Sequence, residues 1–132
     1  MLVVSQEVAE KEVSDWLDKK KIFPQDREAL KYQIDVLVSA VSNGVISIDE
    51  QGNLIHKLLF PLDNEKPVTT LKYKGRLAEK DTRRAMKGVS PGDVDGRVNA
   101  LIMSLTDESS GVIGALDTAD SKIAKAITNF FF

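Results

Sequence analysis

The residues with the widest chemical repertoire in this chain are one histidine and several aspartates. His56 is the single histidine and there is no cysteine, so a metal site built from several His or Cys ligands is excluded. The stretches 49–52 and 93–96 resemble the first residues of calcium-binding loops. Both have glycine at the fourth position instead of the sixth, and Phe60 and Ser104 stand where such a loop needs glutamate. We therefore expect no metal and no cofactor, and we interpret His56 as a surface or packing residue.

Two aspartates three positions apart, Asp117 and Asp120, are the pair most similar to a catalytic carboxylate dyad. The same spacing at the start of a helix is what a capping interaction produces, so we interpret the pair as helix caps. The chain has no G-x-S-x-G, P-loop or G-x-G-x-x-G motif, the signatures of a nucleophilic serine and of phosphate binding. Counting residues leaves a Ser-His-Asp set open, but no motif points to one. We expect that the protein is not an enzyme.

The composition is typical of a soluble globular domain. Hydrophobic residues make up 42% of the chain and charged residues 29%, with a formal net charge of −2. These values exclude a disordered chain and give no global attraction to nucleic acid or to an anionic membrane. Residues 1–12 lack the features of a signal peptide, and no segment reaches the ~18 apolar residues of a membrane span. The sequence therefore predicts one intracellular domain, residues 1–132, with no membrane contact.

Charge is distributed unevenly along the chain. Residues 72–87 contain seven basic and two acidic side chains, whereas residues 88–121 contain one basic and six acidic side chains. The two stretches are either solvated faces that partly neutralise each other or an electrostatically biased docking face. Acid in the first turns of the later helices disfavours contact with phosphates, so a DNA-binding regulator is the least favoured binding role.

The first 44 residues are predicted to form a helical hairpin. Ser5 is placed to cap a helix over residues 6–20, and Pro24 to open a second helix over residues 24–43. Gly44 is placed to end that second helix in the left-handed conformation. The apolar residues of the second helix recur at helical spacing and comprise Leu30, Ile34, Leu37, Val38 and Val41.

Residues 45–75 are predicted to form an antiparallel β-meander. A hairpin joins residues 45–48 to residues 54–60, and Pro61 is expected to end the second strand. A third strand is predicted over residues 68–74. Alternation places Thr69, Leu71 and Tyr73 on one of its faces and leaves the other face to solvent.

Residues 76–132 are predicted to be a helical half of three to four helices. A basic helix over residues 79–87 is followed by one that Ser90 caps and Pro91 opens, and then by a short helical turn near residues 112–116. Asp117 is expected to cap the last helix, with Asp120 in the capping-box position. The predicted fold class is therefore α+β in a single domain of three parts, 1–44, 45–75 and 76–132.

Three consecutive phenylalanines, Phe130, Phe131 and Phe132, follow the apolar stripe of the last helix. Three adjacent helical positions span about 200° of helix surface, so all three rings cannot face one core. We expect at least one ring to meet a partner or another subunit, because exposed apolar patches usually mark binding surfaces.

From about residue 54 to residue 132 the chain resembles the tail assembly chaperones of tailed bacteriophages, especially those of contractile-tailed, Mu-like phages. Five motifs in order support the resemblance: an L-x-x-P strand, a second strand, an arginine followed by a short helix with an aspartate, a helix with a leucine-threonine end, and an L-D-x-x-D segment with a terminal aromatic pair. They are Lys57–Pro61, Val68–Tyr73, Arg76–Asp81, Leu101–Thr106, and Leu116–Asp120 with Phe130-Phe131.

The resemblance implies a protein without catalytic residues or cofactor that works in the host cytoplasm. Such chaperones bind the tape measure protein, and in some cases the tail tube subunit, and they are usually absent from the finished particle. Helix-in-groove binding would suit this role. The candidate groove residues are Leu101, Leu105, Ile123, Ile127, Phe130, Phe131 and Phe132.

Other interpretations stay open. Periodic stripes normally face inward, so Leu101, Leu105, Ile123 and Ile127 are alternatively the core of the domain itself. A structural tail or virion protein, whose β-meander joins a larger sheet, is the second functional hypothesis, and a homo-oligomer is compatible with both.

Overall fold

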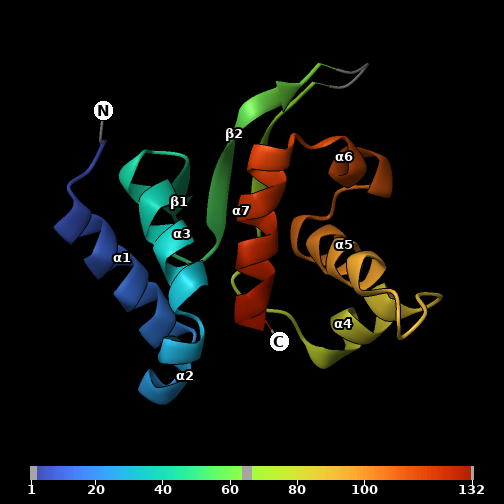
Figure 1. The fold of residues 1–132 in the computed structure, drawn as a ribbon, viewed down its shortest axis with the longest axis horizontal. Coiled ribbons are helices and arrows are strands. Elements are labelled where there is room, and N and C mark those ends of the chain that lie inside the picture. The colour runs from blue at the N-terminus through green and yellow to red at the C-terminus, as the bar shows by residue number, and fades with distance from the viewer. Residues whose placement is uncertain (1–2, 64–66, 132) are drawn as a thin grey trace.

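The computed structural model describes residues 3–63 and 67–131. Within them, seven α-helices and one three-stranded antiparallel sheet form an α+β fold, which confirms the predicted class. Helices α1 to α3 lie on one side of the sheet region and α4 to α6 on the other, with α7 between the two groups (Figure 1). No helix in the described part of the chain is long and apolar enough to cross a membrane.

Helix α1 (Gln6–Lys19) begins where predicted, because the Ser5 side chain accepts a hydrogen bond from the Val8 N–H. Lys21 has a φ of 62°, and Ile22 N–H donates to the carbonyl of Leu17, which closes the end of the helix. The buried side chains of α1 form one stripe at helical spacing: Ala9, Val13, Trp16 and Leu17.

The predicted second helix is in fact two helices, α2 (Pro24–Ala29) and α3 (Lys31–Ser42), separated at Leu30. No residue of α2 is buried, so its direction is set by polar contacts. Arg27 donates to the carbonyl of Ile22 and pairs with Asp18 at the end of α1. Helix α3 instead packs its apolar stripe against α1 and α7. The expectation of one continuous helix was therefore wrong, because the two halves are held by different surfaces.

The sheet consists of β1 (Ile46–Ile48), β2 (Leu54–Leu62) and β3 (Val68–Tyr73) in the order β1-β2-β3. The calcium-like stretch 49–52 forms the first turn, in which the Asp49 carboxylate accepts the N–H groups of Gln51 and Asn53. The residues 64–66 of the predicted second turn lie outside the described residues.

Strand β2 continues past Pro61, which corrects its predicted end. Regular pairing with β3 stops at Lys57, opposite Thr70, and resumes at Leu62, opposite Val68. Residues 58–61 of β2 therefore face a single residue of β3, Thr69. Proline is tolerated here because an irregular stretch of strand needs no ladder hydrogen bond from it.

One face of the sheet is buried under the helices and the other is largely open. Alternation along β2 and β3 turns the buried side chains to the same side, and these are Leu54, His56, Leu58, Leu71 and Tyr73. Exposed polar residues, including Lys57, Thr70 and Lys72, lie on the opposite face. This arrangement confirms the expected solvated side of the meander.

The C-terminal half comprises α4 (Glu79–Met86), α5 (Val94–Thr106), α6 (Ser110–Ala115), α7 (Thr118–Thr128) and a final 3₁₀ turn (Asn129–Phe131). The start of α5 differs from the prediction. Asp93 caps this helix by accepting the Gly96 N–H at 2.9 Å, while Asp93 N–H donates to the carbonyl of Ser90 and closes a turn. Ser90 and Pro91 thus precede the helix and do not begin it.

Candidate binding cleft

Most of the candidate groove residues of α5 and α7 belong to the core of the domain. Leu101, Leu105 and Ile127 are each at most 1% exposed. Phe130 is 5% exposed, and its ring packs edge-on against that of Trp16, with 5.3 Å between the ring centroids. Leu101, Leu105 and Ile127 thus fill the interior of this chain, as the alternative interpretation of the stripes proposed, and the Phe130 ring lies there with them. Ile123, the fourth residue of that interpretation, is 9% exposed.

The remaining aromatic positions are arranged differently. Phe131 is partly buried, and the Lys20 Nζ lies 3.4 Å from the centroid of its ring while donating to the carbonyl of Gly75. Burial, with a smaller contribution from the charge of Arg76, lowers the pKa of Lys20 to about 8. Phe132 lies outside the described residues, so the expectation that one terminal ring meets a partner stays a prediction.

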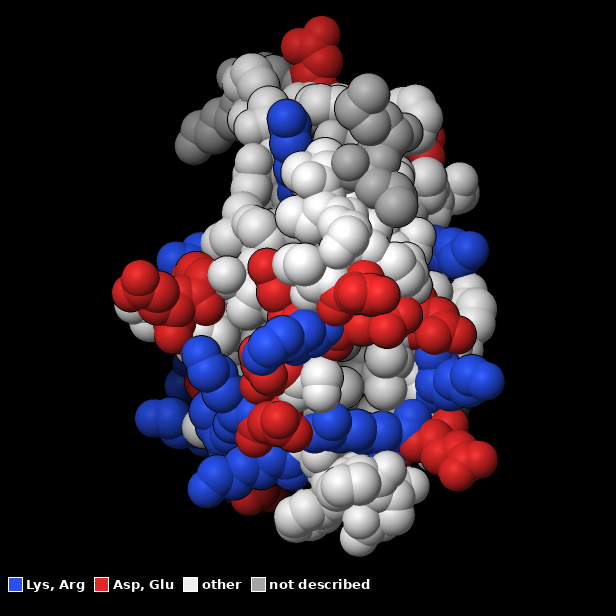
Figure 2. Space-filling model, turned by 90° about the vertical axis from the view of Figure 1, so that its left-hand side faces the viewer, with Lys and Arg blue, Asp and Glu red and all other residues white. Residues whose placement is uncertain are grey.

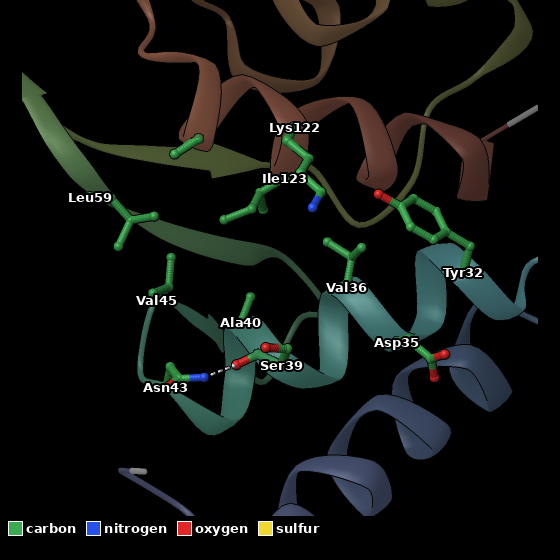
Figure 3. Close-up of a pocket in the computed structure, with 11 residues that line it drawn as sticks. Tyr32, Asp35, Val36, Ser39, Ala40, Asn43, Val45, Leu59, Lys122 and Ile123 are labelled. Carbon is green, nitrogen blue, oxygen red and sulfur yellow. Dashed lines mark hydrogen bonds between the residues drawn. The ribbon is translucent and has the colours of Figure 1, made fainter. Parts of the chain in front are cut away.

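An open apolar cleft of about 670 Å³ lies between α3 and α7 and reaches the irregular part of β2. Figure 3 shows Val36, Val45, Leu59 and Ile123 directed into the same space from α3, the approach to β1, β2 and α7. Among the candidate groove residues that the structure describes, Ile123 is the one that lines this cleft. Asp35, on the rim, is turned instead towards α1 (Figure 3).

Large apolar side chains are exposed at the β2 end of the cleft. Leu59 is 48% exposed and its neighbour Phe60 is 56% exposed. Figure 2, which looks onto the α1 side of the molecule, shows charged side chains across its middle, an uncharged cluster at its lowest tip and a mostly uncharged area at the upper end, where the β2–β3 ribbon projects in Figure 1. Charge is therefore concentrated across the middle of this side and is sparse around the β2–β3 end.

Asp120 holds the backbone that presents these side chains. Leu59 N–H donates to Asp120 Oδ1 at 2.8 Å, and Phe60 N–H donates to Oδ2 at 3.0 Å. Both N–H groups belong to the stretch of β2 that has lost regular pairing with β3, so the carboxylate replaces a neighbouring strand. Asp117 caps α7 as expected, by accepting the Ala119 N–H. The capping-box interpretation of Asp120 was wrong, because its carboxylate is fully buried against β2.

His56 completes a buried polar network with Asp120 and Tyr73, all three of which are 0% exposed. His56 Nε2 lies 3.0 Å from Asp120 Oδ1, and Nδ1 lies 2.9 Å from the Tyr73 hydroxyl oxygen. Because the carboxylate accepts, Nε2 carries the proton of the neutral ring and Nδ1 accepts from the tyrosine. Burial lowers the pKa of His56 despite the opposing effect of Asp120, and burial also raises the pKa of Tyr73.

This network joins α7 to the sheet and is closed to solvent. Through Leu59 N–H it also holds one wall of the cleft. The sequence offered one usable signal: His56 alternates with Leu54 and Leu58 on the buried face of β2, and a buried histidine needs polar partners. Asp120 lies 64 residues away along the chain, and no local pattern indicates that it is the partner. No group of three or more residues suited to a metal ion occurs in residues 3–63 and 67–131.

A second cleft, of about 650 Å³, lies between α4 and α5 and is lined by charges of both signs. Lys74 Nζ contacts Asp107 Oδ1 at 2.8 Å and the carbonyl oxygen of Ser104 at 3.1 Å. Lys74 comes from the basic stretch 72–87 and Asp107 from the acidic stretch 88–121. The two oppositely charged stretches of the sequence thus meet within the fold and partly neutralise each other here.

Comparison of the chain with protein-family models, with curated proteins and with solved structures found no match. The likeness to tail assembly chaperones therefore depends on the motifs in residues 54–132. The function has to be inferred from these motifs and from the geometry of the α3–α7 cleft.

Proposed function

We propose that this protein is a phage tail assembly chaperone that binds an apolar helical segment of the tape measure protein in the α3–α7 cleft. The observation that supports the proposal most is the half-exposed Leu59, held in place by Asp120 beside an apolar space of about 670 Å³. Burying the exposed half of this leucine against a partner contributes about 1 kcal/mol, roughly half of the gain for a fully exposed leucine. A surface of this kind suits helix-in-groove binding and needs no reaction.

The proposed contact surface differs from the residues that the helical stripes suggested. Ile123 remains part of it, and Leu59, Val36 and Val45 replace Leu101, Leu105, Ile127 and Phe130, which are buried in the domain. A partner helix would then touch three elements of this chain together. The tail tube subunit is a second possible partner for the same cleft, and the protein would act in the host cytoplasm before the tail is complete.

Co-expression with the tape measure protein of the same phage tests the proposal. We expect the two proteins to co-purify, and we expect Leu59→Asp to abolish the complex because it places a charge in the apolar contact. Val94→Asp is the matched control, since Val94 is 68% exposed at the start of α5, away from the cleft. Retention of the complex by Leu59→Asp would contradict the proposal.

A structural tail or virion protein is the second candidate. It is favoured by the two edge strands, β1 and β3, to which a larger sheet could add strands, and by the open outer face, against which another layer could pack. Mass spectrometry of purified particles separates the candidates. A chaperone is absent from them or present in trace amounts, and a structural protein is present in stoichiometric amounts.

A further inference from the structure

The α3–α7 cleft continues into a second, more polar hollow of about 330 Å³ along the same two helices. Tyr32 and Lys122 line both hollows, so the two form one surface. Lys125, three residues further along α7, lines the polar end, and Gln33 of α3 faces it from the other wall. A helix lying in the apolar part would therefore extend over these polar groups.

Several polar groups of this surface have no partner within the described chain. Neither the Lys122 and Lys125 amines nor the Tyr32 hydroxyl forms a hydrogen bond or ion pair with any described residue, and all three side chains are exposed. The Gln33 Oε1 is buried and also lacks a hydrogen-bond partner among the described residues. The carboxamide can turn to present its NH₂ group instead, which is a donor. Buried polar groups are normally satisfied, so this one is satisfied either by water in the open hollow or by a bound partner.

The charge of this surface is positive along α7. Among the described residues that line the two hollows, Asp35 is the one acidic residue, and it is turned towards α1 (Figure 3). Lys122 and Lys125 are three residues apart, which places them on the same side of α7. Two ammonium groups, a phenol hydroxyl and a carboxamide are together suited to bind carboxylates.

We infer that the cleft selects an amphipathic helix with an acidic flank: its apolar stripe lies against Val36, Leu59 and Ile123, and its Asp or Glu side chains pair with Lys122 and Lys125. The inference rests on the proposed function and adds the chemical class and the orientation of the partner. Complementary charge of this kind contributes selectivity and register more than total affinity.

Synthetic helical peptides test the inference with the full-length protein. Three peptides share one leucine stripe, at positions i, i+3 or i+4, and i+7, and carry Glu, Gln or Lys along the same flank. Fluorescence anisotropy of the labelled peptides gives each Kd at low and at high salt. We expect the Glu peptide to bind about tenfold more tightly than the Lys peptide at low salt. The Glu peptide forms two exposed ion pairs with Lys122 and Lys125, whereas the Lys peptide is repelled by the same two side chains. We expect high salt to narrow this difference.

Charge reversal on the protein provides the matched comparison. Lys122→Glu with Lys125→Glu is expected to reverse the order of the peptides. Lys57→Glu with Lys72→Glu, two exposed lysines on the outer face of the sheet, is expected to leave it unchanged. Circular dichroism and the Tm of each variant show that it is folded.

The outcomes separate the two proposals. Equal affinity for the three peptides, together with loss of all binding in Leu59→Asp, overturns the charge selectivity and leaves the cleft as the binding site. Peptide binding that Leu59→Asp does not weaken overturns both. Concentration-dependent dimers that exclude the peptides also overturn the inference, because a second copy of this chain would then be the occupant.

Discussion

Two clefts of this domain, one between α3 and α7 and one between α4 and α5, have nearly the same volume and opposite chemistry. The α3–α7 cleft has apolar walls, a half-exposed leucine and lysines without partners in the described chain, whereas the α4–α5 cleft is lined by charges of both signs, of which Lys74 and Asp107 are paired. Other charged side chains of the α4–α5 cleft, Arg84, Lys87 and Glu108, also form no ion pair with a described residue. The comparison therefore shows that neither size nor unpaired charge identifies a docking surface by itself. The half-exposed Leu59 beside apolar walls is what distinguishes the α3–α7 cleft.

The walls of the two clefts are also held by different interactions. Behind the α3–α7 cleft, the carboxylate of Asp120 is fully buried and bonds to β2 and to His56. Beside the α4–α5 cleft, the ion pair of Lys74 and Asp107 is largely in contact with solvent. Buried networks are costly to break and exposed pairs are not, so the same kind of substitution should have very different effects in the two places.

The largest effect is expected for Asp120→Ala. It leaves the Leu59 and Phe60 N–H groups and the His56 ring without their acceptor, and we expect the free energy of unfolding to fall by about 3–5 kcal/mol. Urea denaturation measures the loss. Asp117→Ala is the matched control, because it also replaces an aspartate but removes only the cap of α7. We expect it to lower the free energy of unfolding by about 1 kcal/mol. Similar losses in the two variants would mean that the network does not hold the cleft wall.

A second test separates the core side of α7 from its cleft side. Ile127→Ala is expected to lower the free energy of unfolding by about 2–5 kcal/mol, because it leaves a cavity in a closed core. Ile123→Ala should cost less, since its space opens into the cleft and solvent can enter. Thermal denaturation of the two variants gives the comparison. An equal or larger loss for Ile123 would show that the cleft is closed in solution.

The buried histidine predicts a dependence on pH. Its pKa in the folded state lies below the ordinary value near 6.5, so the unfolded chain binds the additional proton first as the pH falls. The stability contributed by the neutral ring is present above pH 6.5 and is lost on acidification, by at most about 1.4 kcal/mol per pH unit. Urea denaturation between pH 7.5 and 5 measures this slope. His56→Gln should remove the histidine contribution, and an unchanged slope in that variant would assign it to other groups.

The smallest effect is expected at the α4–α5 cleft. A double-mutant cycle of Lys74→Ala and Asp107→Ala should give a coupling of about 0.2–1 kcal/mol, the usual range for exposed ion pairs. Neither substitution should change binding of the tape measure protein. Loss of binding in the Lys74 variant, with stability unchanged, would place the docking surface at the α4–α5 cleft and contradict the comparison.

Local signals in the sequence were sufficient for most of the elements. Ser5, Gly44 and Asp117 act at helix ends as expected, because caps and left-handed glycines depend on neighbours within a few residues. His56 was left as a surface or packing residue, although its alternation with Leu54 and Leu58 was a local signal for the buried face of β2. The break at Leu30 was not readable, because Arg27 contacts Asp18 of α1 and the carbonyl of Ile22, and the contact with Asp18 depends on how the two helices pack.

By itself, the sequence determined the order of helices and strands, the apolar stripes and the α+β class, since periodicity and capping act over one or two turns. Only the tertiary structure decided which stripes are core and which line a surface. It also paired Asp120 with His56 and the irregular part of β2, across 64 residues of chain. The physical reason is that burial and hydrogen-bond satisfaction depend on which segments meet in space. A residue whose partner is far along the chain shows its type in the sequence and its role only in the fold.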